Sequence, residues 1–333
     1  MKRIIEEWYH APGRHCASTA IRDAMRFWGI DCSEALCFGL GRGIGAFYMS
    51  NPNFSPSRWL MTRGPDLEER YFTAIGVPFA WRQASDPDDA WLKTKRDIDA
   101  GIPVLLQTDL YYLPYYNTKT HFNRHAVLLW GYDEEKYVGF LSDTDKEGLI
   151  EVPLDALSQS RNSAFPPGPV KYDWFPVHRP EKFGDLKNIA LKALRLNALE
   201  LAGVPKDYPI KVGLRALEAL VEDLPNWENS PDWKWSARFA YQAIERRGTG
   251  GGAFRKIYAE FIEETENLAP EIGELGLLKL MREIASTWSE FAAYLKAISE
   301  QERPEGFRGA TEIADKLLKL ESNYCNAVLK ERN

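Results

Sequence analysis

The chain has 333 residues, of which 44% are hydrophobic and 27% charged, and its formal net charge is -6. This length suffices for two folded domains, and the composition excludes the disordered and collagen-like classes. The acidic balance argues against nucleic-acid binding, which needs a basic surface to neutralise phosphates, and favours a neutral or cationic small substrate.

Helical and strand patterns alternate in the first half of the chain. Apolar residues at three- and four-residue steps predict a helix over residues 16–28, which Gly29 ends. Residues 38–45 are rich in glycine but lack the preceding strand of a dinucleotide-binding motif, so we do not interpret them as a phosphate loop. Two further helices are predicted over residues 66–75 and 88–100.

The pattern then changes to that of strands, at residues 103–108, 125–130 and 137–142. Turn residues separate these segments, which predicts an antiparallel sheet. Residues 164–180 contain five prolines and no regular periodicity, so they are interpreted as a connector.

Helical periodicity dominates the rest of the chain and predicts a helical bundle. The predicted helices cover residues 182–201, 210–224, 233–247, 253–267, 271–299 and 310–329. We therefore predict an α+β protein with a catalytic domain over residues 1–165, a proline-rich linker over 166–180 and an all-α domain over 181–333.

The sequence shows neither a targeting signal nor the cysteine spacing of a disulfide framework. No apolar run reaches the length of a signal peptide or a membrane-spanning helix, so we expect a cytoplasmic protein without a membrane partner. The four cysteines form no C-x-x-C pair, and no histidine stands at ligand spacing beside Cys32 and Cys37. We interpret all four as thiols and expect no metal.

Cys16 is the candidate nucleophile because it stands at the start of a predicted helix. Unpaired backbone N–H groups and the helix dipole stabilise negative charge there, which favours the thiolate that attacks carbonyls. The alternative is a small buried residue, since free cysteine is among the most buried residue types.

His125 and Asp143 stand at the two ends of a predicted hairpin whose centre is near Glu134. In a hairpin without a bulge they would be directly opposed, with Cβ atoms about 5 Å apart, which suits an imidazole oriented by a carboxylate. The alternative is a histidine bound to a backbone carbonyl and an aspartate that forms a turn. The order Cys, His, Asp on helix, strand and strand is that of papain-like thiol enzymes.

These segments resemble the butirosin biosynthesis protein H family, and the resemblance covers most of residues 10–170. Residues 246–258 also resemble the helical domain that follows in this family. The segments that carry the resemblance in the first domain are residues 15–19, 33–34, 38–41, 63–64, 101–109, 113–115, 121–127, 131–133 and 142–144.

The resemblance implies a papain-like cysteine acyltransferase of antibiotic biosynthesis, with the triad Cys16, His125 and Asp143. The family's named member moves an aminoacyl group from an acyl-carrier-protein thioester to an aminoglycoside amine. By similarity we expect a carrier protein or CoA as donor, a small-molecule amine as acceptor, and no cofactor beyond the phosphopantetheine of the donor. The oligomeric state is not implied.

Eight other residues are candidates for binding. His15, Asp109, Tyr115 and His121 match the family pattern and are predicted to bind substrate, although each could equally make local hydrogen bonds in a loop. The glycine-rich connector at residues 248–252 lies among basic residues and could hold a phosphate with its N–H groups, or be a flexible connector. Its candidate residues are Arg247, Gly250, Gly251 and Arg255.

Three functions remain open at the level of sequence. The first is acyl transfer through Cys16 to an amine, and the second is hydrolysis of a peptide or amide bond by the same triad. The third is a noncatalytic module that keeps the fold and binds a carrier protein or a metabolite.

Overall fold

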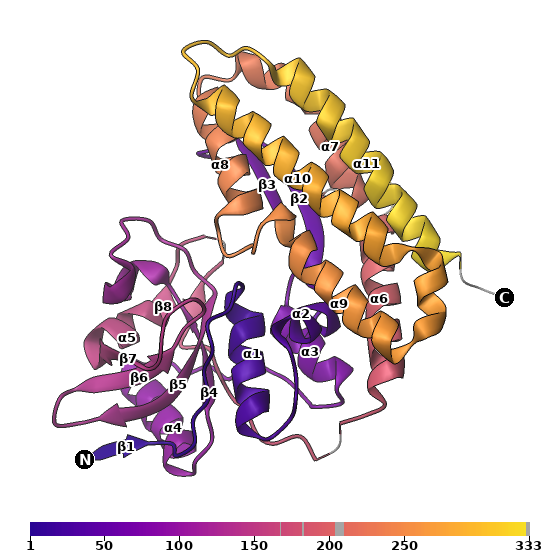
Figure 1. Ribbon diagram of the computed structural model, residues 1–333. Helices are drawn as coiled ribbons and strands as arrows, with labels where there is room; N and C mark the ends of the chain where they lie inside the picture. The colour runs from indigo at the N-terminus through magenta and orange to yellow at the C-terminus, as the bar shows by residue number, and fades with distance from the viewer. Residues whose placement is uncertain (167, 182, 204–209, 331–333) are drawn as a thin grey trace. The chain divides into compact units, whose positions relative to one another are not determined.

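An antiparallel sheet of six strands organises the first half of the chain in the computed structural model (Figure 1). The strand order is β10-β4-β5-β6-β7, and β1 also pairs with β5. All nine residues of β5 are buried, which explains its nearly continuous apolar run. The antiparallel sheet predicted from sequence is confirmed. Its strands are β1 (Lys2–Ile4), β4 (Val104–Thr108), β5 (His125–Asp133), β6 (Val138–Ser142), β7 (Ile150–Pro153) and β10 (Trp174–Pro176).

The structure describes residues 1–166, 168–181, 183–203 and 210–330, and the chain forms two compact units. The first unit comprises Met1–Cys37 and Ile75–Phe183, and the second comprises Phe38–Ala74 and Gly184–Asn333. Residue 167 of the predicted linker, residue 182 at the predicted start of a helix, and residues 204–209 and 331–333 of the predicted helical domain lie outside the described residues.

Two helices of the first unit, α1 (Cys16–Phe27) and α4 (Pro87–Asp99), begin and end within one residue of their predicted bounds. In α1 Ala20, Ile21, Ala24 and Met25 form the buried stripe, and Gly29 follows with φ 75°. The helix α4 starts with an Asp86 side chain that accepts the Asp89 N–H. The helix α5 (Leu154–Ser160), which the sequence did not indicate, follows β7 directly.

The proline-rich segment differs from the predicted linker because part of it belongs to the sheet of the first unit. The strand β10 pairs with β4, and β9 (Val170–Lys171) pairs with β8 (Asn162–Ser163). Val170, Trp174 and Val177 are buried, and this apolar burial holds the segment in the unit.

The second unit contains long helices and a small sheet of three strands, β11-β2-β3. The strand β3 packs on α8, with the rings of Trp59 and Phe239 5.2 Å apart. Among the described residues no helix is both long and apolar enough to cross a membrane. The helices are α3 (Leu67–Ala74), α6 (Leu186–Ala202), α7 (Leu214–Asp223), α8 (Trp233–Glu245), α9 (Arg255–Leu268), α10 (Leu277–Ser299) and α11 (Phe307–Leu329).

Residues 38–74 also differ from the predicted domain division, because they group with the helical unit. This segment supplies β2 (Ile44–Ser50) and β3 (Arg58–Arg63), and β2 pairs in turn with β11 (Lys211–Val212). Tyr48 on β2 stacks on Trp227 and donates a hydrogen bond of 2.5 Å to Asp223. These long-range contacts place the strands among the helices.

Candidate functional site

Cys16 is the first residue of α1, as the sequence predicted. His15 caps the helix, because its Nδ1 accepts the N–H of Ser18 at 3.3 Å. Cys16 is partly exposed, whereas Cys32, Cys37 and Cys325 are buried. Of the four thiols, Cys16 is thus the one that a dissolved reagent can reach most readily.

Cys32 and Cys37 lie side by side as thiols, with their sulfurs 3.1 Å apart. That distance is about 1 Å longer than a disulfide bond. Within the described residues no group of three or more His, Cys, Asp or Glu side chains is arranged to hold a metal ion.

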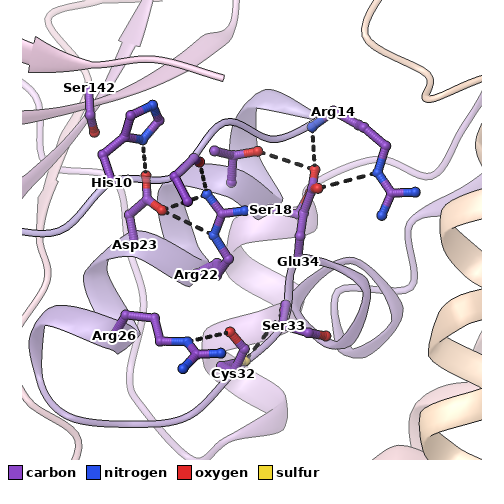
Figure 2. Close-up of polar contacts among 12 residues, drawn as sticks. His10, Arg14, Ser18, Arg22, Asp23, Arg26, Cys32, Ser33, Glu34 and Ser142 are labelled. Carbon is purple, nitrogen blue, oxygen red and sulfur yellow. Dashed lines mark hydrogen bonds and ion pairs between the residues drawn. The ribbon is translucent and has the colours of Figure 1, made fainter. Parts of the chain in front are cut away.

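A buried carboxylate holds the turn that leads into Cys16. Oε1 of Glu34, at the start of α2 (Glu34–Leu40), accepts the backbone N–H of Arg14 at 2.8 Å (Figure 2). It also accepts the backbone N–H of His15 at 2.8 Å. The same oxygen accepts the hydroxyl of Thr19 at 3.2 Å. Sequence reasoning did not identify this role, although a glutamate in the mostly apolar stretch from residue 32 to 40 was a readable signal.

Glu34→Gln is expected to lower both stability and Cys16 reactivity. The substitution removes the charge that two backbone N–H groups share, and hydrogen bonds to a charged group contribute about 1.5–3 kcal/mol. Urea unfolding would measure the loss in the free energy of unfolding. The alkylation rate of Cys16 would show whether the turn that leads into it has changed. Exposed Glu6 supplies the matched control, Glu6→Gln. Equal behaviour of the two variants would refute the anchoring role.

The hairpin of β5 and β6 has a register that differs from the predicted one. Leu128 pairs with Ser142, so the same register extended by one residue places Asp143 opposite Val127. The pairing shifts at Trp130, which is an extra residue on β5 and forms a bulge. His125 is thus displaced from Asp143 by two residues, and an even displacement keeps both on one face of the sheet.

His125 and Asp143 nevertheless meet. The Nε2 atom of His125 lies 2.8 Å from Oδ1 and 2.9 Å from Oδ2 of Asp143. A side-chain hydrogen bond also joins His125 to Cys16. Because the carboxylate engages Nε2, Nδ1 is the ring nitrogen that remains for the sulfur. The structure therefore brings together the three residues of the predicted triad.

Two tyrosines and a threonine surround the His125–Asp143 pair. The hydroxyl of Tyr115 donates to Oδ2 of Asp143 at 2.6 Å, and Thr144 donates to Oδ1 at 2.8 Å. The hydroxyl of Tyr116 lies 3.2 Å from Nε2 of His125. Both tyrosines come from the short helix η2 (Pro114–Tyr116). Tyr115 was predicted to bind substrate, but its hydroxyl contacts Asp143; Tyr116 and Thr144 were missed.

The electrostatics of this pair favour a charged imidazolium beside a carboxylate. Burial alone would lower the pKa of His125, but the charge of Asp143 and hydrogen bonds to Asp143 and Cys16 outweigh burial and raise this pKa to about 10. Burial would raise the pKa of Asp143, yet His125, Tyr115 and Thr144 together lower it. The protonated imidazole therefore persists through neutral pH and is lost only as the pH rises through about 10.

Buried Asp109 and half-buried His121 form a second pair in the same unit. His121 Nδ1 lies 2.7 Å from Asp109 Oδ2, which also accepts the Ser163 hydroxyl at 2.8 Å. The other Asp109 oxygen accepts the N–H groups of Tyr111 and Phe122. These bonds join the two ends of the loop that carries Tyr115 and Tyr116, so Asp109 and His121 act as a clamp at its base. Buried His15 serves the helix cap described above.

Arg255, which was predicted to hold an anion beside the glycine-rich connector, is instead bonded within the protein. Arg255 is fully buried; its Nε pairs with Glu321 at 2.9 Å, and its other nitrogens donate to carbonyls of Gly45, Thr62 and Ala253. The Gly252 N–H donates to the Glu245 carboxylate at 2.8 Å. These contacts contradict the role predicted for Arg255, because its guanidinium already has protein partners. Of the other candidates, Gly251 N–H donates to Thr249, Arg247 donates to Gln242, and Gly250 has a positive φ of 64°.

Arg255→Ala is expected to destabilise the second unit by about 3–5 kcal/mol. The change would leave the Glu321 carboxylate buried without its cation, which is the costly way to break a buried ion pair. Urea unfolding of the full chain measures this loss. The neighbouring exposed Lys256 gives a matched control, and Lys256→Ala should unfold as the unaltered chain does. A comparable midpoint for Arg255→Ala would show that the ion pair is dispensable.

Comparison with known proteins identifies two family models on this chain. The model described as butirosin biosynthesis protein H, N-terminal, matches residues 15–144, and therefore includes Cys16, His125 and Asp143. The model described as domain of unknown function (DUF4872) matches residues 155–328. A search of curated proteins gave no match. The resemblance inferred from the sequence is confirmed, and the chain belongs to the butirosin biosynthesis protein H family.

Proposed function

We propose that the chain is a cysteine-dependent acyltransferase, which takes an acyl or aminoacyl group from a carrier-protein or CoA thioester and delivers it to an amine. The observation that carries the proposal is the position of His125, which is hydrogen-bonded to Cys16 and to Asp143 at once. The family name supports a role in the biosynthesis of an aminoglycoside-like antibiotic.

In the first step the Cys16 thiolate attacks the carbonyl carbon of the donor thioester. The tetrahedral oxyanion forms near the N terminus of α1, where the backbone N–H of Cys16 is our candidate donor. Collapse of this intermediate breaks the bond to the donor sulfur. His125, as the imidazolium, gives its proton to the departing thiolate, and the acyl group remains on Cys16 as a thioester.

In the second step the acceptor amine attacks the acyl-Cys16 carbonyl. Neutral His125 accepts a proton from the attacking nitrogen, and the Cys16 thiolate leaves. The products are an amide and the thiolate–imidazolium pair with which the cycle began. Asp143 keeps its charge throughout, and it orients the imidazole and stabilises its protonated form.

Intact-protein mass spectrometry tests the proposal. The chain is incubated with acyl-N-acetylcysteamine, which carries the thiol end of phosphopantetheine, and the adduct is mapped by peptide fragmentation. We expect one acyl group on Cys16, and its discharge as an amide when primary amines, including amino sugars, are added. Free acid as the sole product, even with excess amine, would instead identify a hydrolase. Failure to acylate Cys16 with any thioester would favour a noncatalytic module.

A further inference from the structure

A second buried histidine outside the proposed triad links the elements that carry Cys16 and Asp143. The Nδ1 atom of His10 lies 2.6 Å from Oδ2 of Asp23, and its Nε2 lies 2.8 Å from the backbone oxygen of Lys146. Figure 2 shows the imidazole directed at the Asp23 carboxylate. The side chains of His10 and Asp23 are both 0% exposed, so no solvent substitutes for these partners.

Both partners of His10 accept hydrogen bonds. A backbone carbonyl has no proton to give, and the Asp23 carboxylate also accepts the guanidinium of Arg22 at 2.7 Å. Both ring nitrogens of His10 must therefore carry protons if both bonds are to form, and the ring is an imidazolium. A neutral ring has one N–H and would direct a lone pair at one of the two acceptors.

The charges around His10 favour its protonation overall. Burial would lower the pKa of His10, but the hydrogen bond and charge of Asp23 and the Lys146 carbonyl outweigh it, so the pKa is raised. Arg22, on the same helix as Asp23, opposes this. On the side of the turn, the nearby charges are the Asp145 carboxylate and the Lys146 ammonium, which pair with each other at 3.2 Å.

The two partners of His10 belong to the two halves of the proposed site. Asp23 lies on α1, which begins with Cys16, and Lys146 closes the turn that begins at Asp143 through a backbone hydrogen bond of 2.9 Å. A second bond strengthens the connection, since the Gly13 N–H donates to the Thr144 carbonyl at 2.6 Å.

We propose that His10 is a positioning residue, whose doubly protonated ring holds the turn of residues 143–146 against α1 and so keeps Asp143 within reach of His125. The proposal rests on the function proposed above for Cys16, His125 and Asp143. Because the bridge needs both protons, it is complete only while the ring is an imidazolium. It is lost as the pH rises through the raised pKa of His10.

Nuclear magnetic resonance of the full chain labelled with 15N-histidine tests the protonation state directly. The chain has five histidines, and His10→Gln assigns the His10 signals by their loss. We expect both nitrogens of His10 to carry protons at neutral pH. On alkaline titration the His125 signals should shift together with the deprotonation of His10, a coupling that is observable without any variant. A neutral His10 ring at neutral pH, or titrations without coupling, would overturn the proposal.

The pH profile of Cys16 alkylation by iodoacetamide tests the consequence for the site. His10→Gln is expected to slow alkylation about tenfold at neutral pH, which corresponds to the loss of one hydrogen bond to a charged group, and to remove the alkaline inflection that belongs to His10. Exposed His178 gives the control, and His178→Gln should reproduce the unaltered profile. An unchanged profile for folded His10→Gln would overturn the positioning role.

The two proposals fail in distinguishable ways. If His125→Ala leaves the alkylation profile of Cys16 unchanged, the triad is refuted, while the protonation state of His10 is still read from its own signals. If instead the triad behaves as proposed and His10 is neutral, the positioning role alone is lost.

Discussion

Cys16→Ala is expected to abolish acylation of the chain by thioesters. The substitution removes the one nucleophile that the proposed first step uses, and removal of a catalytic nucleophile costs about 10⁶-fold in other triad enzymes. The helix start, the His125–Asp143 pair and the Glu34 anchor all remain, so the fold should be retained. Intact-protein mass spectrometry after incubation with acyl-N-acetylcysteamine measures the result, and thermal unfolding verifies that the variant is folded.

Cys325→Ala is the corresponding control, because Cys325 is a buried thiol on α11 of the second unit. This variant should acquire one acyl group at Cys16, as the unaltered chain does. Stoichiometric acylation of the Cys16→Ala variant would place the reactive thiol elsewhere and contradict the proposed mechanism.

The position of Cys16 followed from local information alone. A stripe of apolar residues at helical spacing and a terminal glycine set the bounds of α1, and both signals lie within the helix and the residues beside it. Helix ends are fixed by neighbouring residues, so a cysteine at such an end is readable from sequence.

The meeting of His125 and Asp143 was predicted for a reason that was partly wrong. The sequence indicated a hairpin centred near Glu134, but Asp133 pairs with Val138, so the turn lies further along the chain and offsets the register by three residues. The bulge at Trp130, which nothing within the two strands announces, reduces this offset to two residues. The pair still forms because the register differs from the predicted one by two residues, and an even difference leaves His125 and Asp143 on the same face of the sheet. An error of one residue would have separated them.

Contacts between distant segments were beyond sequence reasoning. Glu34, on α2, stabilises the turn that leads into Cys16 on α1. Buried Arg255 forms an ion pair with Glu321, which lies 66 residues away in the sequence. The sequence pattern of a basic residue beside glycines is the same whether its side chain binds a ligand or pairs with a buried carboxylate. Alternating buried residues in β2 are a strand signal, but the glycines that precede this segment led us not to predict a strand there.

Asp143→Asn is expected to reduce acyl transfer by about 10²- to 10⁴-fold and to move its alkaline limit to lower pH. The neutral amide fills the same volume but no longer stabilises the imidazolium. Burial then dominates and lowers the pKa of His125 from its raised value of about 10. A raised pKa keeps the ring of His125 protonated up to that pH. When the pKa falls, the upper pH limit of the thiolate–imidazolium pair therefore falls with it. Transfer rates measured across the pH range report both effects.

The matched control removes an exposed carboxylate from the same unit. Asp155 lies on α5, and Asp155→Asn should preserve both the rate and the alkaline limit. Tyr115→Phe separates orientation from charge, because it removes the 2.6 Å hydrogen bond to Asp143 and leaves the carboxylate ionised. If Asp143 acts through its charge, Tyr115→Phe should slow transfer far less than Asp143→Asn and leave the alkaline limit nearly in place. A shift of that limit as large as the one caused by Asp143→Asn would mean that the position of the carboxylate, more than its charge, sustains the imidazolium.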